Sequence, residues 1–211
     1  MKQSQLFQDY EFLSDEADTA FSKVENEFGS CVTCKQHCSD CCNAVFGLFL
    51  IEAAYIKQHF DKLDTNIKKQ ALLRSDKSDM EIRQLENKLK TFENDPKMRD
   101  YTLAKERIRC PLLDDEQNCI LYSFRPITCR VYGIPTAIQG KGRVCGKAQF
   151  EKGKQYPTFD LDGAYKRLYT LSKELLSDIT DDDNPDKASL LISVSMAIKS
   201  PLENIIKENL A

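Results

Sequence analysis

The sequence has no long hydrophobic run and little excess of charge of either sign. No stretch reaches the roughly eighteen consecutive apolar residues that a membrane-spanning helix needs, so we expect no membrane span. The 30 lysine and arginine residues nearly balance the 33 aspartate and glutamate residues, which leaves a formal net charge of −3. Because nucleic-acid and anionic-membrane binding usually depend on a clear positive excess, the composition predicts neither partner.

The start of the chain also lacks the features of a secretory signal. Residues 1–10 are polar, with no basic stretch followed by an apolar one. We therefore expect a reducing, cytoplasmic setting, in which dense cysteines more often bind metal or act in catalysis than form disulfides. A secreted scaffold crosslinked by disulfides is the less favoured alternative, because such scaffolds are usually short and carry a signal.

Histidine is scarce, with only His37 and His59 in the chain. His37 lies among cysteines and could coordinate a metal or donate to a thiolate, although a polar loop position is the favoured interpretation. His59 falls on the polar side of an expected helix and has no evident function. No acidic residue is placed to orient either ring, so a cysteine nucleophile with a histidine base is disfavoured.

Cysteine, by contrast, is abundant, and its distribution organises the chain. Thiolate sulfur is a soft ligand that suits zinc and iron–sulfur clusters, and short spacings let one loop supply several ligands. A single four-coordinate ion cannot use five neighbouring thiols. We therefore predict that two groups of cysteines converge on one or two cysteine-ligated metal sites. The nine candidate ligands are Cys31, Cys34, Cys38, Cys41 and Cys42 in the first group and Cys110, Cys119, Cys129 and Cys145 in the second.

The spacing of the first group favours an iron–sulfur cluster over a zinc ribbon. The pairs Cys31-x2-Cys34 and Cys38-x2-Cys41 are separated by only three residues, a gap much tighter than a usual ribbon loop. Compact runs of cysteines are typical of ferredoxin segments, whose clusters also take a remote cysteine. A [4Fe-4S] cluster is therefore the leading cofactor expectation, and zinc is the alternative.

A basic segment accompanies the later cysteines. Residues 117–150 contain no aspartate or glutamate, yet they include several arginines and lysines. Because an all-cysteine site carries net negative charge, Arg125 and Arg130 are candidates to offset that charge by hydrogen bonds or by their field. In an iron site this would raise the reduction potential. Ordinary surface or ion-pairing roles stay open for both arginines.

The remaining sequence predicts helices around this cysteine-rich core. Apolar residues recur at spacings of three and four over 6–28, 165–179 and 190–198, and a further helix is expected over about 50–60. We predict two helices over 63–105, with Ser75 to Asp79 as the break between them and Asp95-Pro96 as the exit. Residues 181–185 should end the helix at 165–179. A capping box at Ser200-Pro201-Leu202-Glu203 should begin a last helix to Leu210.

Two short features are expected within the second cysteine group. Asp114 to Asn118 is a turn-forming stretch, which would place Cys110 and Cys119 at the two ends of a small hairpin. Pro126 occupies a suitable first position for a short helix.

The expected architecture is a single, mainly α domain over residues 1–211. Its irregular, cysteine-rich metal-binding core comprises residues 31–60 and 108–150 and is surrounded by a helical bundle. A charged helical insertion covers about 61–107, and C-terminal helices cover about 160–211.

The order of motifs resembles the YkgJ-type cysteine-cluster family, described as zinc- or iron-chelating domains, over roughly residues 31–146. The resemblance is carried by Cys34 to Cys42, Cys110-Pro-Leu-Leu, Cys119-Ile-Leu-Tyr122, Arg125-Pro126, and Cys129-Arg130 with Tyr132. Family members usually show Cys-x2-Cys-x2-Cys-Cys, whereas this chain has Cys34-x3-Cys38-x2-Cys41-Cys42 and an added Cys31. The resemblance implies metal or cluster binding and no settled reaction, although a flagellin lysine methylase is among the relatives.

The spacing Cys34-x3-Cys38-x2-Cys41 is also similar to the motif by which radical S-adenosylmethionine enzymes bind a [4Fe-4S] cluster. In those enzymes the residue before the last cysteine is commonly aromatic, whereas here it is Asp40. Their fold alternates strands with helices, and this sequence shows few strand-like alternations and no evident glycine-rich segment for binding the methionine moiety. This second resemblance is therefore disfavoured.

The leading functional interpretation is iron–sulfur cluster binding with a redox or electron-transfer role, together with an unidentified redox or protein partner. One alternative is a zinc-stabilised binding module, in which the metal contributes folding energy. The other is a cluster-dependent modifying enzyme, such as a protein methyltransferase that uses S-adenosylmethionine.

Overall fold

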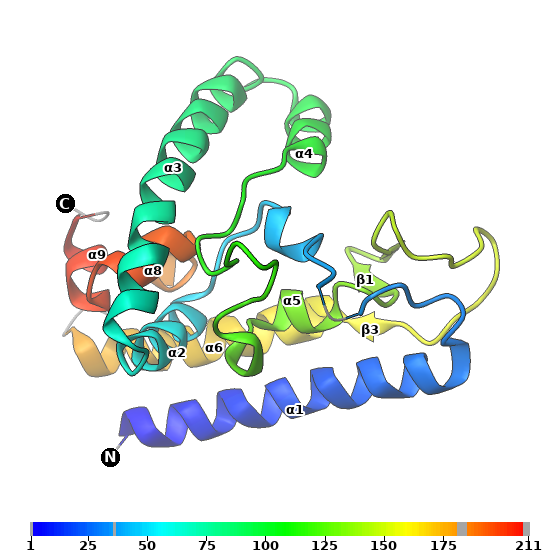
Figure 1. Ribbon diagram of the computed structural model, residues 1–211, viewed down its shortest axis with the longest axis horizontal. Coiled ribbons are helices and arrows are strands. Elements are labelled where there is room, and N and C mark those ends of the chain that lie inside the picture. Colours follow the sequence, from blue (N-terminus) through cyan, green and yellow to red (C-terminus); the bar gives the residue numbers. More distant parts are fainter. Residues whose placement is uncertain (1, 36, 181–184, 209–211) are drawn as a thin grey trace.

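A computed structural model of the chain describes residues 2–35, 37–180 and 185–208, and most of these residues are helical (Figure 1). Helix α1 (Lys2–Phe28) runs along one side of the molecule. Its apolar residues at helical spacing are buried, among them Tyr10, Leu13, Ala17 and Val24. The predicted amphipathic helix over 6–28 is therefore confirmed, and its apolar stripe faces the core.

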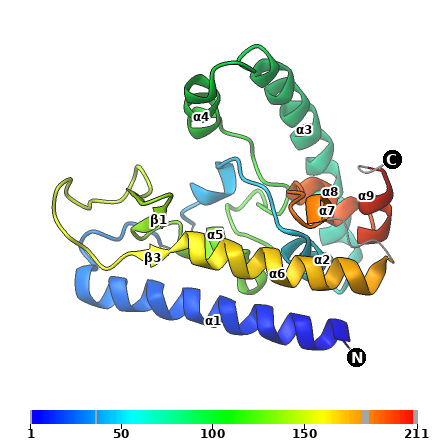
Figure 2. The same ribbon diagram turned by 180° about the vertical axis from the view of Figure 1, so that it is seen from behind.

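Helices α2 (Leu50–Asp61) and α6 (Leu161–Ile179) pack with α1 to form the main helical layer (Figures 1 and 2). Every residue from Leu50 to Ile56 is buried, so α2 is enclosed around most of its surface. Helix α6 begins four residues before the predicted start at 165, because the Asp160 side chain caps it by accepting the Gly163 N–H at 3.0 Å. Residues 181–184, where we predicted a stop signal, lie outside the described residues.

The predicted break at Ser75 to Asp79 is wrong. Helix α3 (Thr65–Lys90) continues through it without interruption. The Ser75 hydroxyl donates to the Ala71 carbonyl at 3.0 Å, so its polar group is satisfied inside the helix and does not disrupt it. The side of the helix that carries Ser75 and Ser78 is buried. A serine-rich stretch was thus mistaken for a turn, when small residues were needed there for close helix packing.

Asp95-Pro96 begins a helix instead of serving as an exit. The Asp95 side chain accepts the Met98 N–H at 3.0 Å and caps α4 (Pro96–Lys105), with Pro96 at the first helical position. Together α3 and α4 form an arm that projects from the helical layer (Figures 1 and 2). Among the described residues, none of the helices is both long and apolar enough to cross a membrane.

The C-terminal part contains α7 (Pro185–Ala188), α8 (Val194–Lys199) and α9 (Leu202–Glu208). The helix predicted over 190–198 begins only at Val194, because residue 192 adopts extended backbone. Leu48 and Ile192 exchange backbone hydrogen bonds of 2.8 and 2.9 Å as an isolated antiparallel bridge. The predicted last helix is described to Glu208, and its final residues lie outside the described part of the chain.

A small sheet was not predicted. It contains β1 (Thr136–Ile138), β2 (Lys141–Arg143) and β3 (Phe159–Asp160) in the order β2-β1-β3. Strands β1 and β2 form a hairpin through Gln139 and Gly140, whose φ angles of 52° and 69° suit a tight two-residue turn. The strands are too short to show an alternating pattern. The described residues do not form the alternating strand–helix barrel of radical S-adenosylmethionine enzymes.

The cysteine-rich segments lie between the helical layer and the α3–α4 arm (Figure 1). They contain only short elements: η1 (Cys41–Asn43), η2 (Tyr122–Phe124) and α5 (Ile127–Val131). The chain is therefore mainly helical with an irregular cysteine-rich region, as predicted. Pro126 lies just before α5, at the N-cap position, and not at the first helical position as predicted.

Candidate metal centre

Five cysteines converge on one place in the structure. We call them the inner thiol group: Cys41, Cys42, Cys110, Cys119 and Cys129. All five line the same cavity, and thiol hydrogen bonds link Cys129 to Cys41, Cys41 to Cys42, and Cys42 to Cys119. Residues far apart in the chain thus supply neighbouring sulfur atoms.

Backbone pairing brings the first two segments together. After η1 the chain runs beside residues 107–110, with the Ile108 N–H donating to the Asn43 carbonyl at 3.1 Å. The Cys110 N–H donates to the Cys42 carbonyl at 2.7 Å. These bonds fix Cys110 directly beside the adjacent cysteines of η1.

The predicted turn between Cys110 and Cys119 is confirmed. The Asp114 side chain accepts the Asn118 N–H at 2.7 Å, and Leu113 pairs with Cys119 in an antiparallel bridge. Asp114 thus acts as the turn-forming residue that its side-chain chemistry favours. The loop between the two cysteines therefore folds back on itself and returns Cys119 to the inner thiol group.

The helix that carries Cys129 is held by a buried glutamate. Glu52 on α2 accepts two backbone N–H groups, from Phe49 at 3.1 Å and from Ile127 at 3.0 Å. One carboxylate therefore caps the first turns of both α2 and α5. Its side chain is almost completely buried, and this burial raises the pKa of Glu52 to about 7. The sequence-based predictions gave Glu52 no specific role, although a glutamate in the first turn of an apolar helix was the available signal.

Three further cysteines form an outer thiol group next to the inner one: Cys34, Cys38 and Cys145. Burial, followed by the charges of Cys38 and Cys41, raises the pKa of Cys34 to about 11. The Cys145 thiol donates to the Asp40 carboxylate at 3.4 Å, and Lys147 pairs with the same carboxylate at 3.5 Å. Cys145 therefore has charged neighbours.

Gly133 allows the close approach of the outer group to α5. A Cβ atom at this position would lie 2.7 Å from the Cβ of Cys34 and 3.2 Å from the Phe21 ring. Only glycine fits this spacing without moving a neighbour.

Cys31 and the two histidines stand apart from these groups. The Cys31 carbonyl accepts the Gln149 N–H at 2.8 Å, and Cys31 is not among the residues that line the cavity of the inner thiols. His37 is exposed, with a left-handed φ of 66°. His59, expected on the polar side of its helix, is half-buried, and its ring stacks on Phe124 with centroids 3.6 Å apart.

All nine cysteines are free thiols, and within residues 2–35, 37–180 and 185–208 no three Cys, His, Asp or Glu side chains already surround a common point as metal ligands. Four of the inner thiols are instead hydrogen-bonded to one another. To bind a metal at the usual sulfur distance of about 2.3 Å, they would turn from their partners toward a shared centre, which side-chain rotation allows. The soft donor set fits a thiophilic metal or cluster.

The hydrogen bonds among the inner thiols polarise them. Bonds from Cys129 and Cys42 lower the pKa of Cys41 well below its ordinary value, and a bond from Cys42 lowers the pKa of Cys119. The partners that donate these bonds have raised pKa values, as has Cys110, where burial raises the pKa to about 12. Some inner thiols are therefore stabilised as thiolates, the form that binds metal.

The two candidate arginines occupy different places. Arg125 stacks on Tyr122, with its Cζ 3.7 Å from the ring centroid, and its positive charge lowers the pKa values of Cys34, Cys41 and Cys119. Arg130 is buried behind it and donates to the Arg125 carbonyl at 2.8 Å, to the Ser123 carbonyl at 2.7 Å and to the Asp18 carboxylate. Arg125 thus acts on the thiols, whereas Arg130 holds the loop that carries Arg125.

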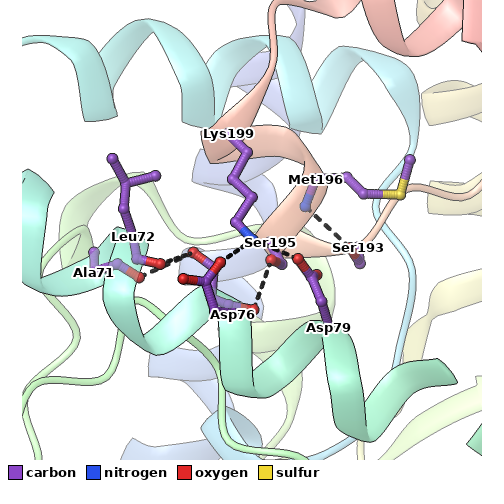
Figure 3. Close-up of polar contacts among 9 residues, drawn as sticks. Ala71, Leu72, Asp76, Asp79, Ser193, Ser195, Met196 and Lys199 are labelled. Carbon is purple, nitrogen blue, oxygen red and sulfur yellow. Dashed lines mark hydrogen bonds and ion pairs between the residues drawn. The ribbon is translucent and has the colours of Figure 1, made fainter. Parts of the chain in front are cut away.

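The inner thiol group forms one wall of an apolar cavity of about 70 Å³, and α3 and α8 supply the far wall with Ser78, Ile82 and Ser195. Figure 3 shows how these two helices are joined there. Lys199 on α8 pairs with Asp76 at 2.6 Å and Asp79 at 2.5 Å, and the Ser195 hydroxyl donates to the Ser75 carbonyl at 3.2 Å. These contacts hold α3 of the arm against α8.

A second hollow, the outer cleft, reaches the thiols from another side. It has a volume of about 420 Å³. It is lined by Cys34, Lys35, His37, Cys38, Cys41, Cys42, Leu113, Gln117, Asn118, Cys119, Tyr122 and Arg125. Because Cys41, Cys42, Cys119 and Arg125 line both hollows, these four side chains separate the apolar cavity from the cleft.

Comparison with known proteins agrees with this arrangement of cysteines. A family model named CxxCxxCC and described as a putative zinc- or iron-chelating domain matches residues 33–146, more than half of the chain. The match begins before Cys34 and ends just after Cys145, so it covers both thiol groups. No curated protein and no solved structure matched the chain. On its cysteine pattern, the chain belongs to the CxxCxxCC family of zinc- or iron-chelating domains.

Proposed function

We propose that the inner thiol group binds an iron–sulfur cluster with a redox or electron-transfer role. The observation that carries this proposal is the convergence of five thiols on one apolar cavity of about 70 Å³. A structural zinc site uses four ligands arranged closely around a single ion. A [4Fe-4S] cluster also takes four cysteines, so the number of thiols does not separate the two; the open space beside them is what suits a cluster of several atoms better than one ion.

The surroundings of the inner thiol group support a redox role. The cavity beside the thiols is lined largely by apolar side chains, such as Phe46, Ile56 and Ile82, and Arg125 supplies positive charge from the cleft side. Burial and nearby positive charge are the means by which proteins set the potential of an iron–sulfur cluster. When bound, the cluster would supply one-electron chemistry. The inner thiols would hold it, and Glu52 would keep Cys129 in position.

A zinc-stabilised binding module is the second candidate. The observation in its favour is the scarcity of regular structure between α1 and α2 and between α4 and α6, where only short elements connect the cysteines. A segment of this kind gains folding energy from a bound metal. In this case the helical faces, including the α3–α4 arm, would carry the function.

Metal and sulfide analysis after anaerobic purification distinguishes the two candidates. The cluster proposal predicts a brown protein that contains iron and acid-labile sulfide and whose visible absorbance bleaches with dithionite. A colourless protein with stoichiometric zinc and no sulfide would overturn it. S-adenosylmethionine cleavage by the reduced, iron-loaded protein would instead support the modifying-enzyme alternative.

A further inference from the structure

The outer cleft has the size and charge of a binding site for a small anion. Its volume of about 420 Å³ lies within the range of roughly 300–1,000 Å³ that is usual for small-molecule pockets. Two cationic side chains, Lys35 and Arg125, line it, and no aspartate or glutamate among the described residues does so. The cleft therefore presents positive charge directly beside the thiols.

Arg125 is held so that its terminal nitrogens remain available. Its Nε–H donates to the Tyr122 carbonyl at 2.9 Å, and its guanidinium plane lies against the Tyr122 ring, 3.7 Å from the centroid. These two contacts fix the plane but use only one of its five N–H donors. None of the described residues supplies a carboxylate partner for Arg125. A guanidinium fixed in this way is suited to bind the two oxygens of a carboxylate or phosphate at once.

The remaining lining adds neutral hydrogen-bonding groups and an unusual backbone. The amides of Gln117 and Asn118 line the cleft near Tyr122, a ring that is 58% exposed. His37 and Gln117 both have left-handed φ angles, 66° and 64°. Such angles are uncommon for residues other than glycine and tend to occur at ligand-binding sites. Two of them line this one cleft.

We propose that the outer cleft binds a small molecule bearing a carboxylate or phosphate group, held by Arg125 and Lys35 next to Cys41 and Cys119. This proposal goes beyond metal binding. It depends on the cleft residues alone, and it applies whether the thiols hold zinc or an iron–sulfur cluster. An anion bound there would lie beside the metal centre.

Calorimetric titration of the metal-loaded protein with inorganic phosphate, and separately with succinate, tests the proposal. We expect saturable binding of at least one probe, and the tighter of the two identifies the preferred group. R125Q should weaken binding about tenfold or more, since it removes a charged, two-pronged contact. K35Q should weaken it by about threefold, as expected for an exposed charge.

A matched control lies on α4, where Lys105 sits 4.6 Å from the Tyr101 ring centroid as a cation–aromatic pair outside the cleft. K105Q should leave the affinity unchanged. Absence of saturable binding of both probes would overturn the proposal, as would equal losses in K35Q and K105Q. If R125Q loses its metal, the K35Q variant becomes the test. An unchanged affinity of K35Q for phosphate and succinate would contradict the anion site. Iron, zinc and sulfide are measured in the same samples, so failure of the cluster proposal is recorded separately.

Discussion

The inner and outer thiol groups differ in what surrounds them, although they share one stretch of sequence. The inner thiols contact one another and an apolar cavity, whereas Cys145 in the outer group bonds to Asp40, which pairs with Lys147. Cys38 and Cys41 are only three residues apart, yet they belong to different groups. Proximity in sequence therefore does not determine which cysteines act together. The predictions below test this division, from the largest expected effect to the smallest.

Removal of one inner thiol should have the largest effect. C129S removes a sulfur that lies on α5 and is hydrogen-bonded to Cys41, so we expect loss of most of the bound metal and a lower melting temperature. Elemental analysis and thermal unfolding measure both outcomes. The matched control is C31S, whose sulfur lies outside both groups. Equal metal loss in the two variants would contradict the division.

Loss of Glu52 should destabilise the inner group without removing a ligand. E52A leaves the buried N–H of Ile127 and the partly buried N–H of Phe49 without their acceptor. Each such group costs about 1–3 kcal/mol, so we expect the free energy of unfolding to fall by about 2–4 kcal/mol. Urea denaturation measures the change. E86A, at an exposed position of α3, is the control and should change stability by less than about 0.5 kcal/mol. A similar loss in both variants would show that Glu52 has no special role.

The same carboxylate should make stability depend on pH. Burial raises the pKa of Glu52 from 4.5 to about 7, so the folded state binds this proton more tightly than the unfolded state does. Its contribution favours folding at acidic pH and is lost as the pH rises from about 4.5 through 7. The loss amounts to about 3 kcal/mol. Tyr10 and Arg130 face the same carboxylate, and the shift already includes the opposing effect of Arg130.

The measurement is the difference between the unfolding free energies of wild type and E52Q at pH values from 5 to 8. We expect this difference to change with pH, because only the wild-type carboxyl titrates. A difference that is constant across the range would show that the pKa of Glu52 is not raised.

Crowding at the outer group should have the smallest effect. G133A places a methyl group 2.7 Å from the Cβ of Cys34, and such overpacking typically costs about 1–3 kcal/mol. We expect lower thermal stability with the metal of the inner group retained. G142A is the control, since a Cβ there meets no atom within 4 Å. Complete metal loss in G133A would show that the two groups act as one site.

Part of this arrangement could be predicted from the sequence. The periodic apolar stripes predicted α1 and α6, and the turn chemistry of Asp114 to Asn118 placed Cys110 near Cys119. The sequence also predicted that early and late cysteines converge, because a single four-coordinate ion cannot use all five early thiols. Local patterns of this kind are specified by residues close together in the chain.

The remaining features depend on tertiary contacts that local patterns do not encode. Ser75 was interpreted as part of a turn, yet it packs against α8 inside a continuous helix. The double capping role of Glu52 depends on α5, which lies 75 residues further along the chain. The division into inner and outer groups depends on the direction in which each cysteine side chain points. In an irregular segment no helix or strand periodicity determines that direction.

The most direct test is the sulfide and iron content of the triple variant C34S/C38S/C145S after anaerobic purification. This variant lacks the outer thiol group and keeps all five inner thiols. If the inner group holds an iron–sulfur cluster, the variant should retain acid-labile sulfide and dithionite-bleachable absorbance close to wild type. If the wild type shows both signals and the folded variant loses them, the claim that the inner thiol group holds the cluster is contradicted.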